Sequence, residues 1–141
     1  MFHHLRNFIP SILLLAVIAY LSLADFSSIH INPSIPNVDK LVHFCMYLAL
    51  SYVFLFDLTH NVNDRTIRHI NCWCAFIIPT LTGVVLEILQ GYATTTRSFD
   101  FYDMLANMLG AAFGTGLGFF TLPYVFKYFF FHSFDEQSKK K

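Results

Sequence analysis

The sequence predicts an all-α polytopic membrane protein, a bundle of four transmembrane helices with both termini in the cytoplasm. The chain is 55% hydrophobic and only 13% charged, with a mean hydropathy of +0.52, which does not describe a soluble fold. Four apolar stretches approach the length of about 20 residues that a helix needs to cross a bilayer. The basic residues are also shared unequally between the connections.

The predicted spans are 5–24, 41–58, 70–89 and 104–121, within a single domain of residues 1–141. The first stretch is interpreted as a retained span, because its apolar run continues to Leu23 and no cleavage site of small residues follows. The last apolar run is too long for one upright helix. A kink near Pro123 and an interfacial aromatic tail over 122–141 would resolve the excess.

Orientation is predicted from the positive charges, which favour the cytoplasmic side. If the N-terminus is inside, only Lys40 and Arg97 lie outside. The seven basic residues on the cytoplasmic side are Arg6, Arg65, Arg68, Lys127, Lys139, Lys140 and Lys141.

Net charge and cysteines exclude several classes of function. The formal net charge is zero, so nothing favours nucleic-acid binding. Cys45, Cys72 and Cys74 lie in apolar segments, without the spacing of a redox pair or a zinc site. They are expected to be small buried apolar residues. No cofactor is predicted, and no close ligand spacing predicts a metal.

Polar side chains recur at one end of three spans, which is unusual because they are costly in hydrocarbon. Residues three and four apart share one face of a helix, and each span has one such polar face. We therefore expect these faces to converge on a shallow outward pocket, with Gly83, Gly110 and Gly114 allowing close helix approach. The candidate ligand-binding residues are Asp39, Lys40, His43, Tyr47, Glu87, Gln90, Arg97, Asp100, Asp103 and Asn107.

Each candidate also has a structural explanation. Asp100 can cap the fourth helix, and Lys40 can extend toward lipid headgroups. His43 can be a core histidine with satisfied hydrogen bonds, and Tyr47 a packing residue with a hydrogen-bonded hydroxyl. Glu87 is harder to explain structurally, because no basic partner lies at helical spacing within its apolar span.

These residues resemble a family signature in three parts. Asp39-Lys40-x-x-His43-x-x-x-Tyr47, then Glu87-x-x-Gln90, then Arg97 followed by Asp103-x-x-x-Asn107-x-x-Gly110, look like the VanZ-like family of bacterial integral membrane proteins. The resemblance covers residues 39–118. The three threonines before Arg97 depart from the proline or glycine frequent there.

The resemblance implies a multi-pass protein of the bacterial cytoplasmic membrane. It also suggests a link to low-level teicoplanin-type glycopeptide resistance, but it supplies no mechanism. The residues favour binding of a membrane lipid or a lipid-linked envelope precursor. The ten candidates would carry a charge near −2, so a phosphate would be repelled unless carboxylates are protonated or a divalent cation bridges them.

Two alternatives stay open. His43, Glu87 and Asp103 are candidate catalytic acids and bases for a membrane-embedded enzyme acting on such a lipid or its headgroup. A small transporter is less favoured, because the polar residues stop near one surface and no internal repeat is evident. The sequence leaves open a homo-oligomer and does not decide whether there is catalysis.

Overall fold

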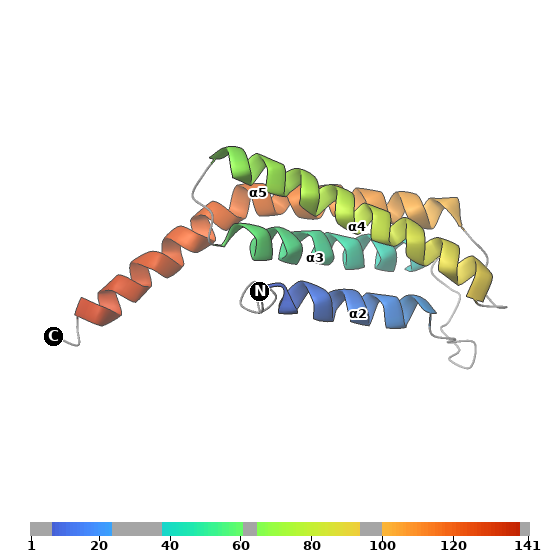
Figure 1. The fold of residues 1–141 in the computed structure, drawn as a ribbon, viewed down its shortest axis with the longest axis horizontal. Helices are drawn as coiled ribbons and strands as arrows, with labels where there is room; N and C mark the ends of the chain where they lie inside the picture. Colours follow the sequence, from blue (N-terminus) through green and yellow to red (C-terminus); the bar gives the residue numbers. More distant parts are fainter. Residues whose placement is uncertain (1–6, 24–37, 61–64, 94–99, 139–141) are drawn as a thin grey trace.

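The computed structural model describes residues 7–23, 38–60, 65–93 and 100–138. These residues form the helices α2 (Ile9–Leu23), α3 (Val38–Thr59), α4 (Arg65–Ala93) and α5 (Phe101–Ser138), with no strand in these ranges. The predicted all-α class is confirmed. Figure 1 shows α2, α3, α4 and α5 side by side, and α2 packs against α3 and α4 on the side away from α5.

Three of the helices are long and apolar enough to span a membrane: α3, the segment Thr66–Tyr92 of α4 and the segment Phe101–Tyr128 of α5. The first predicted span differs. Its described helix, Ile9–Leu23, has 15 residues, which falls short of the required length of about 20 residues. Orientation relative to a membrane stays a prediction.

The distribution of side chains is inverted relative to a soluble protein. Large apolar residues such as Leu13, Trp73 and Phe120 are exposed, whereas His43, Glu87 and Asn107 are buried. In a membrane, exposed apolar side chains contact lipid, and polar groups turn toward neighbouring helices. The same rule corrects the prediction for the cysteines: Cys45 is exposed, and Cys72 and Cys74 are only partly buried.

The pair α3 and α5 forms the most extensive helix contact, and glycine makes it possible. A Cβ atom added at Gly110 would lie 3.0 Å from the carbonyl carbon of Phe44, and one at Gly114 would lie 2.9 Å from that of Leu48. Backbone therefore packs directly on backbone, as small residues allow in membrane helices. The predicted role of these two glycines is confirmed.

The last helix continues through Pro123 to Ser138. Figure 1 shows α5 bending in its orange part and extending beyond the other helices toward the C-terminus. Proline removes one backbone hydrogen bond and bends a helix, so the bend accords with the predicted kink. The interfacial position of 122–141 stays a prediction.

Candidate functional site: a buried polar cluster between three helices

Nine of the ten candidates lie in the described residues, at the end of the bundle where α3 and α5 begin and α4 ends. Here we call them the polar cluster. Arg97 lies outside the described residues, so its predicted position is untested. The polar cluster comprises Asp39, Lys40, His43, Tyr47, Glu87, Gln90, Asp100, Asp103 and Asn107.

Lys40 joins α3 to the start of α5. Its Nζ lies 2.9 Å from Oδ2 of Asp100 and 3.3 Å from Oδ1 of Asp103. It also lies 6.0 Å from the centre of the Tyr102 ring. Lys40 is thus directed toward the carboxylates of the polar cluster.

Asp100 is the N-cap of α5, as expected from its place before the apolar run. Its Oδ1 accepts a hydrogen bond of 2.8 Å from the backbone N–H of Tyr102, which satisfies one of the free donors of the first turn. The Lys40 ammonium and this backbone hydrogen bond lower the pKa of Asp100 below its usual value. Asp100 therefore has a structural role in addition to its ion pair.

His43 connects all three helices. Its Nδ1 lies 3.1 Å from Oδ1 of Asn107 on α5 and 3.5 Å from Oε1 of Glu87 on α4. Its Nε2 lies 3.9 Å from Oδ1 of Asp39 on its own helix. The side chains of His43 and Glu87 are only 4% and 3% exposed. The basic partner that Glu87 lacks along its own helix is supplied by α3.

The deeper members of the polar cluster pack between helices. A Cβ atom at Gly83 would lie 3.1 Å both from the Tyr47 ring and from Cβ of Asn107, so this glycine brings α4 close to α3 and α5. The Tyr47 hydroxyl is buried without a hydrogen bond of standard geometry among the described residues, although the Thr82 side chain of α4 lies near it. Gln90 is buried one turn beyond Glu87.

The three polar faces thus converge as predicted. The nine residues carry a formal charge of −3 if all their carboxylates are ionised. Four carboxylates contribute to it, against the single ammonium of Lys40. Among them, Asp39 is exposed at the rim, whereas Glu87 and Asp103 are buried.

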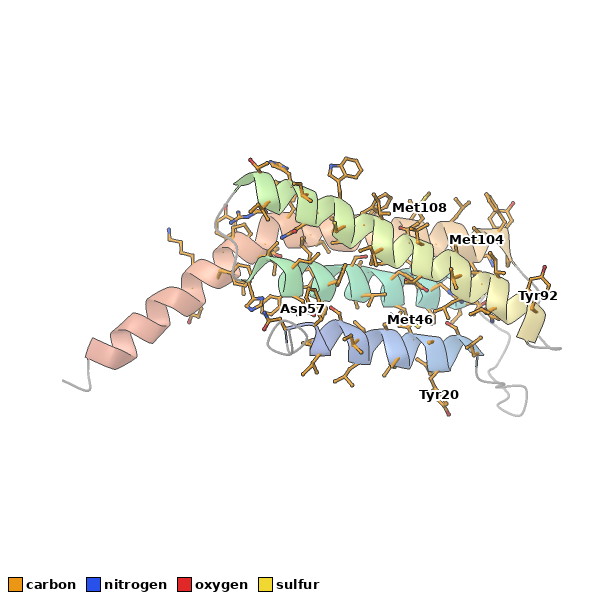
Figure 2. The ribbon with its side chains drawn as sticks, viewed as in Figure 1. Tyr20, Met46, Asp57, Tyr92, Met104 and Met108 are labelled. Atoms are coloured by element: carbon orange, nitrogen blue, oxygen red, sulfur yellow. The ribbon has the colours of Figure 1, made fainter. Side chains whose placement is uncertain are left out.

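Polar groups also occur beyond this end, which the sequence analysis overlooked. Asp57, at the far end of α3, is buried and accepts hydrogen bonds from the backbone N–H and the hydroxyl of Ser11 on α2. Figure 2 shows Asp57 beside the first turns of α2, at the opposite end from Tyr92. The criterion that selected Glu87, a charge within an apolar span, would also have found Asp57.

Two further buried hydroxyls lie between the two ends. Ser51 on α3 and Thr115 on α5 have no partner for their hydroxyls among the described residues. The expectation that polar groups stop near one surface is therefore too narrow. Asp57 serves to attach α2 to α3, because its carboxylate satisfies an N–H in the first turns of α2.

Fold and site together define an all-helical protein of the membrane class with a buried acidic and histidine cluster at one end. The chain belongs to the VanZ/LLP1 family, whose sequence profile matches residues 2–133. An uncharacterized protein of the fission yeast Schizosaccharomyces pombe, C11E3.10, is 31% identical over 103 residues. The match covers 72% of this chain and 55% of that protein, so the chain spans about half the length of this relative. No solved structure matches the chain.

Proposed function

We propose that this VanZ/LLP1-family protein binds the headgroup of a membrane lipid or of a lipid-linked envelope precursor in the polar cluster. The observation that carries the proposal is the burial of Glu87 and His43 between spans that are otherwise apolar. Ionisable residues in membrane spans are rare and commonly mark functional sites. Asp39 and Lys40 at the rim give the cluster an exposed side.

An apolar groove supports a lipid as the ligand. It lies between α2, α3 and α4, has a volume of about 290 Å³, and is lined by residues that include Leu15, Leu50, Pro79 and Thr82. Leu50 lies one helical turn beyond Tyr47. A headgroup in the polar cluster would therefore have an apolar surface below it along which an acyl chain can pack.

Orientation and location belong to the same proposal. The positive charges favour placing the polar cluster on the side of the membrane away from the cytoplasm. In a bacterial cytoplasmic membrane this side meets envelope precursors, which would explain a link to teicoplanin-type resistance. The fission-yeast relative favours a ligand chemistry that is not restricted to bacteria, such as a phosphate-bearing lipid headgroup.

A membrane-embedded enzyme is the second candidate, and the contact between His43 and Glu87 favours it. A histidine held by a carboxylate can act as a general base or acid, and Asp103 supplies a second carboxyl group near the same position.

A native mass spectrum of gently purified protein tests the proposed lipid binding. We expect one phosphate-bearing lipid to stay bound, whereas a spectrum without retained lipid would contradict it.

A further inference from the structure

We infer that Asp39, His43 and Asp103 form a binding site for a divalent cation of the Mn²⁺ or Zn²⁺ type. One ligand atom from each of these side chains lies within 4.8 Å of the other two. Asp39 and His43 are one turn apart on α3, and Asp103 comes from the first turn of α5. Cation binding would thus join the beginnings of these two helices.

The orientation of His43 is an observation separate from the carboxylates. Its Nδ1 faces two oxygen acceptors, Oδ1 of Asn107 at 3.1 Å and Oε1 of Glu87 at 3.5 Å. In the tautomer in which Nδ1 donates to these oxygens, the lone pair of the imidazole is on Nε2. Histidine ligands of metal ions are held in this way, with the other ring N–H donated to a carboxylate or carbonyl oxygen.

The Nε2 atom of His43 lies on the side of the ring toward Asp39. Oδ1 of Asp39 is 3.9 Å away, which is beyond hydrogen-bonding distance. The His43 side chain is 96% buried. A lone pair on Nε2 would face carboxylate oxygens, an unfavourable arrangement that either a proton on Nε2 or a bound cation relieves.

The charge of the polar cluster gives the cation a role, and this step rests on the proposed function. A formal charge of −3 would repel a phosphate headgroup, whereas a bound divalent cation offsets part of it and offers open coordination positions. Lys40 already contacts Asp100 and Asp103, so its ammonium lies next to the same position. Cation and Lys40 together could then bind phosphate oxygens.

The ligand set indicates which cation to test. One imidazole and two carboxylates suit Zn²⁺ and Mn²⁺ better than Ca²⁺, which prefers six to eight oxygen ligands. Three protein ligands also leave positions for water or for a ligand oxygen, as in catalytic rather than structural zinc sites.

The test is a titration of the full chain in detergent, stripped with a chelator, with Mn²⁺ alone, followed by electron paramagnetic resonance. We expect one Mn²⁺ per chain, displaced by Zn²⁺. Asp39→Asn should weaken Mn²⁺ binding at least about tenfold, by comparison with the losses seen around metal sites. Asp39 is 55% exposed, so this variant should fold.

Tyr92→Lys is the matched control. It changes the charge of the same end of the bundle by the same single unit, and Tyr92 is exposed near the end of α4, outside the polar cluster. We expect it to change Mn²⁺ binding by less than about threefold, as for a change in a screened surface charge. Equal weakening by both substitutions would mean diffuse attraction to negative charge and would overturn the site.

Absence of Mn²⁺ and Zn²⁺ binding would also overturn the inference. If the same preparation then still retained a phosphate-bearing lipid in the native mass spectrum, the proposed lipid binding would stand without the cation. Conversely, cation binding that is lost in Asp39→Asn supports the site even if no lipid is retained, and in that case the lipid proposal fails separately.

Discussion

The Nδ1 atom of His43 lies 3.5 Å from Oε1 of Glu87, and both side chains are almost completely buried between α3 and α4. The two residues are 44 positions apart in the sequence, and each lies in a helix long and apolar enough to cross a membrane. Because burial of ionisable groups is unfavourable unless they are paired, the contact has either a structural or a functional purpose. Conservative substitutions of the two residues distinguish these purposes.

Substitution of the buried carboxyl groups separates a ligand site from a scaffold. Glu87→Gln and Asp103→Asn conserve shape, so a ligand-binding or catalytic role predicts loss of function with little change in thermal stability in detergent. Breaking a buried structural pair would instead lower the free energy of unfolding by about 3–5 kcal/mol. A stability loss of that size would show that the carboxyl groups serve the scaffold.

Arg97 is predicted to close the polar cluster, although it lies outside the described residues. A planar guanidinium can hold one carboxylate and still donate to a ligand, whereas lysine is a point charge on a flexible stem. Arg97→Lys should therefore leave membrane insertion and folding nearly intact and remove most of the lipid binding or resistance. The ion pairs of an exposed loop arginine would contribute at most about 1 kcal/mol to stability, so its substitution would have little effect. Unchanged function in both Arg97→Lys and Arg97→Gln would refute the proposed role of Arg97.

Close packing of α5 on α3 predicts a large difference between two glycines of the same helix. The added methyl group of Gly110→Ala would meet the Phe44 carbonyl group, and that of Gly116→Ala would meet nothing within 4 Å. We expect Gly110→Ala to lower the free energy of unfolding by about 1–3 kcal/mol, as overpacking does. Gly116→Ala should leave it unchanged or raise it. Thermal unfolding in detergent measures both, and equal effects would contradict the observed helix contact.

Membrane orientation is predicted from the seven cytoplasmic basic residues against Lys40 and Arg97. A phosphatase reporter that is active only outside the cytoplasm should be silent at the C-terminus and active when inserted at Thr95. The reverse pattern would place the polar cluster on the cytoplasmic side. It would then rule out contact with envelope precursors in the outer leaflet.

Much of the fold was accessible from the sequence because hydrocarbon imposes simple rules. Apolar length located α3, α4 and α5, and helical spacing placed Lys40, His43 and Glu87 on faces that the structure brings together. Family membership followed from the same residues. The glycines of α5 were also predicted to lie where helices approach closely, which the contacts with Phe44 and Leu48 confirm.

Other features depend on three-dimensional neighbours and could not be predicted. The pairing of Lys40 with Asp100 requires α3 and α5 to begin at the same level, which spacing within one helix does not determine. The surroundings of the Tyr47 hydroxyl likewise depend on side chains of another helix, such as Thr82 on α4. The burial of Asp57 against Ser11 of another helix also depends on the fold, although its charge within a predicted span was visible in the sequence.

The central claim is that the polar cluster selects a lipid headgroup, and site-specific photocrosslinking in bilayers of mixed composition tests it most directly. At the test position, benzoylphenylalanine replaces Tyr102, which is exposed and faces Lys40. At the control position it replaces Tyr124, which is exposed in the part of α5 far from the polar cluster. We predict that the crosslinker at position 102 captures one phosphate-bearing lipid well above the share of that lipid in the bilayer. Asp103→Asn should remove this enrichment. The crosslinker at position 124 should capture lipids in proportion to their abundance. Crosslinks at position 102 that follow bilayer composition, with or without Asp103→Asn, would contradict the account.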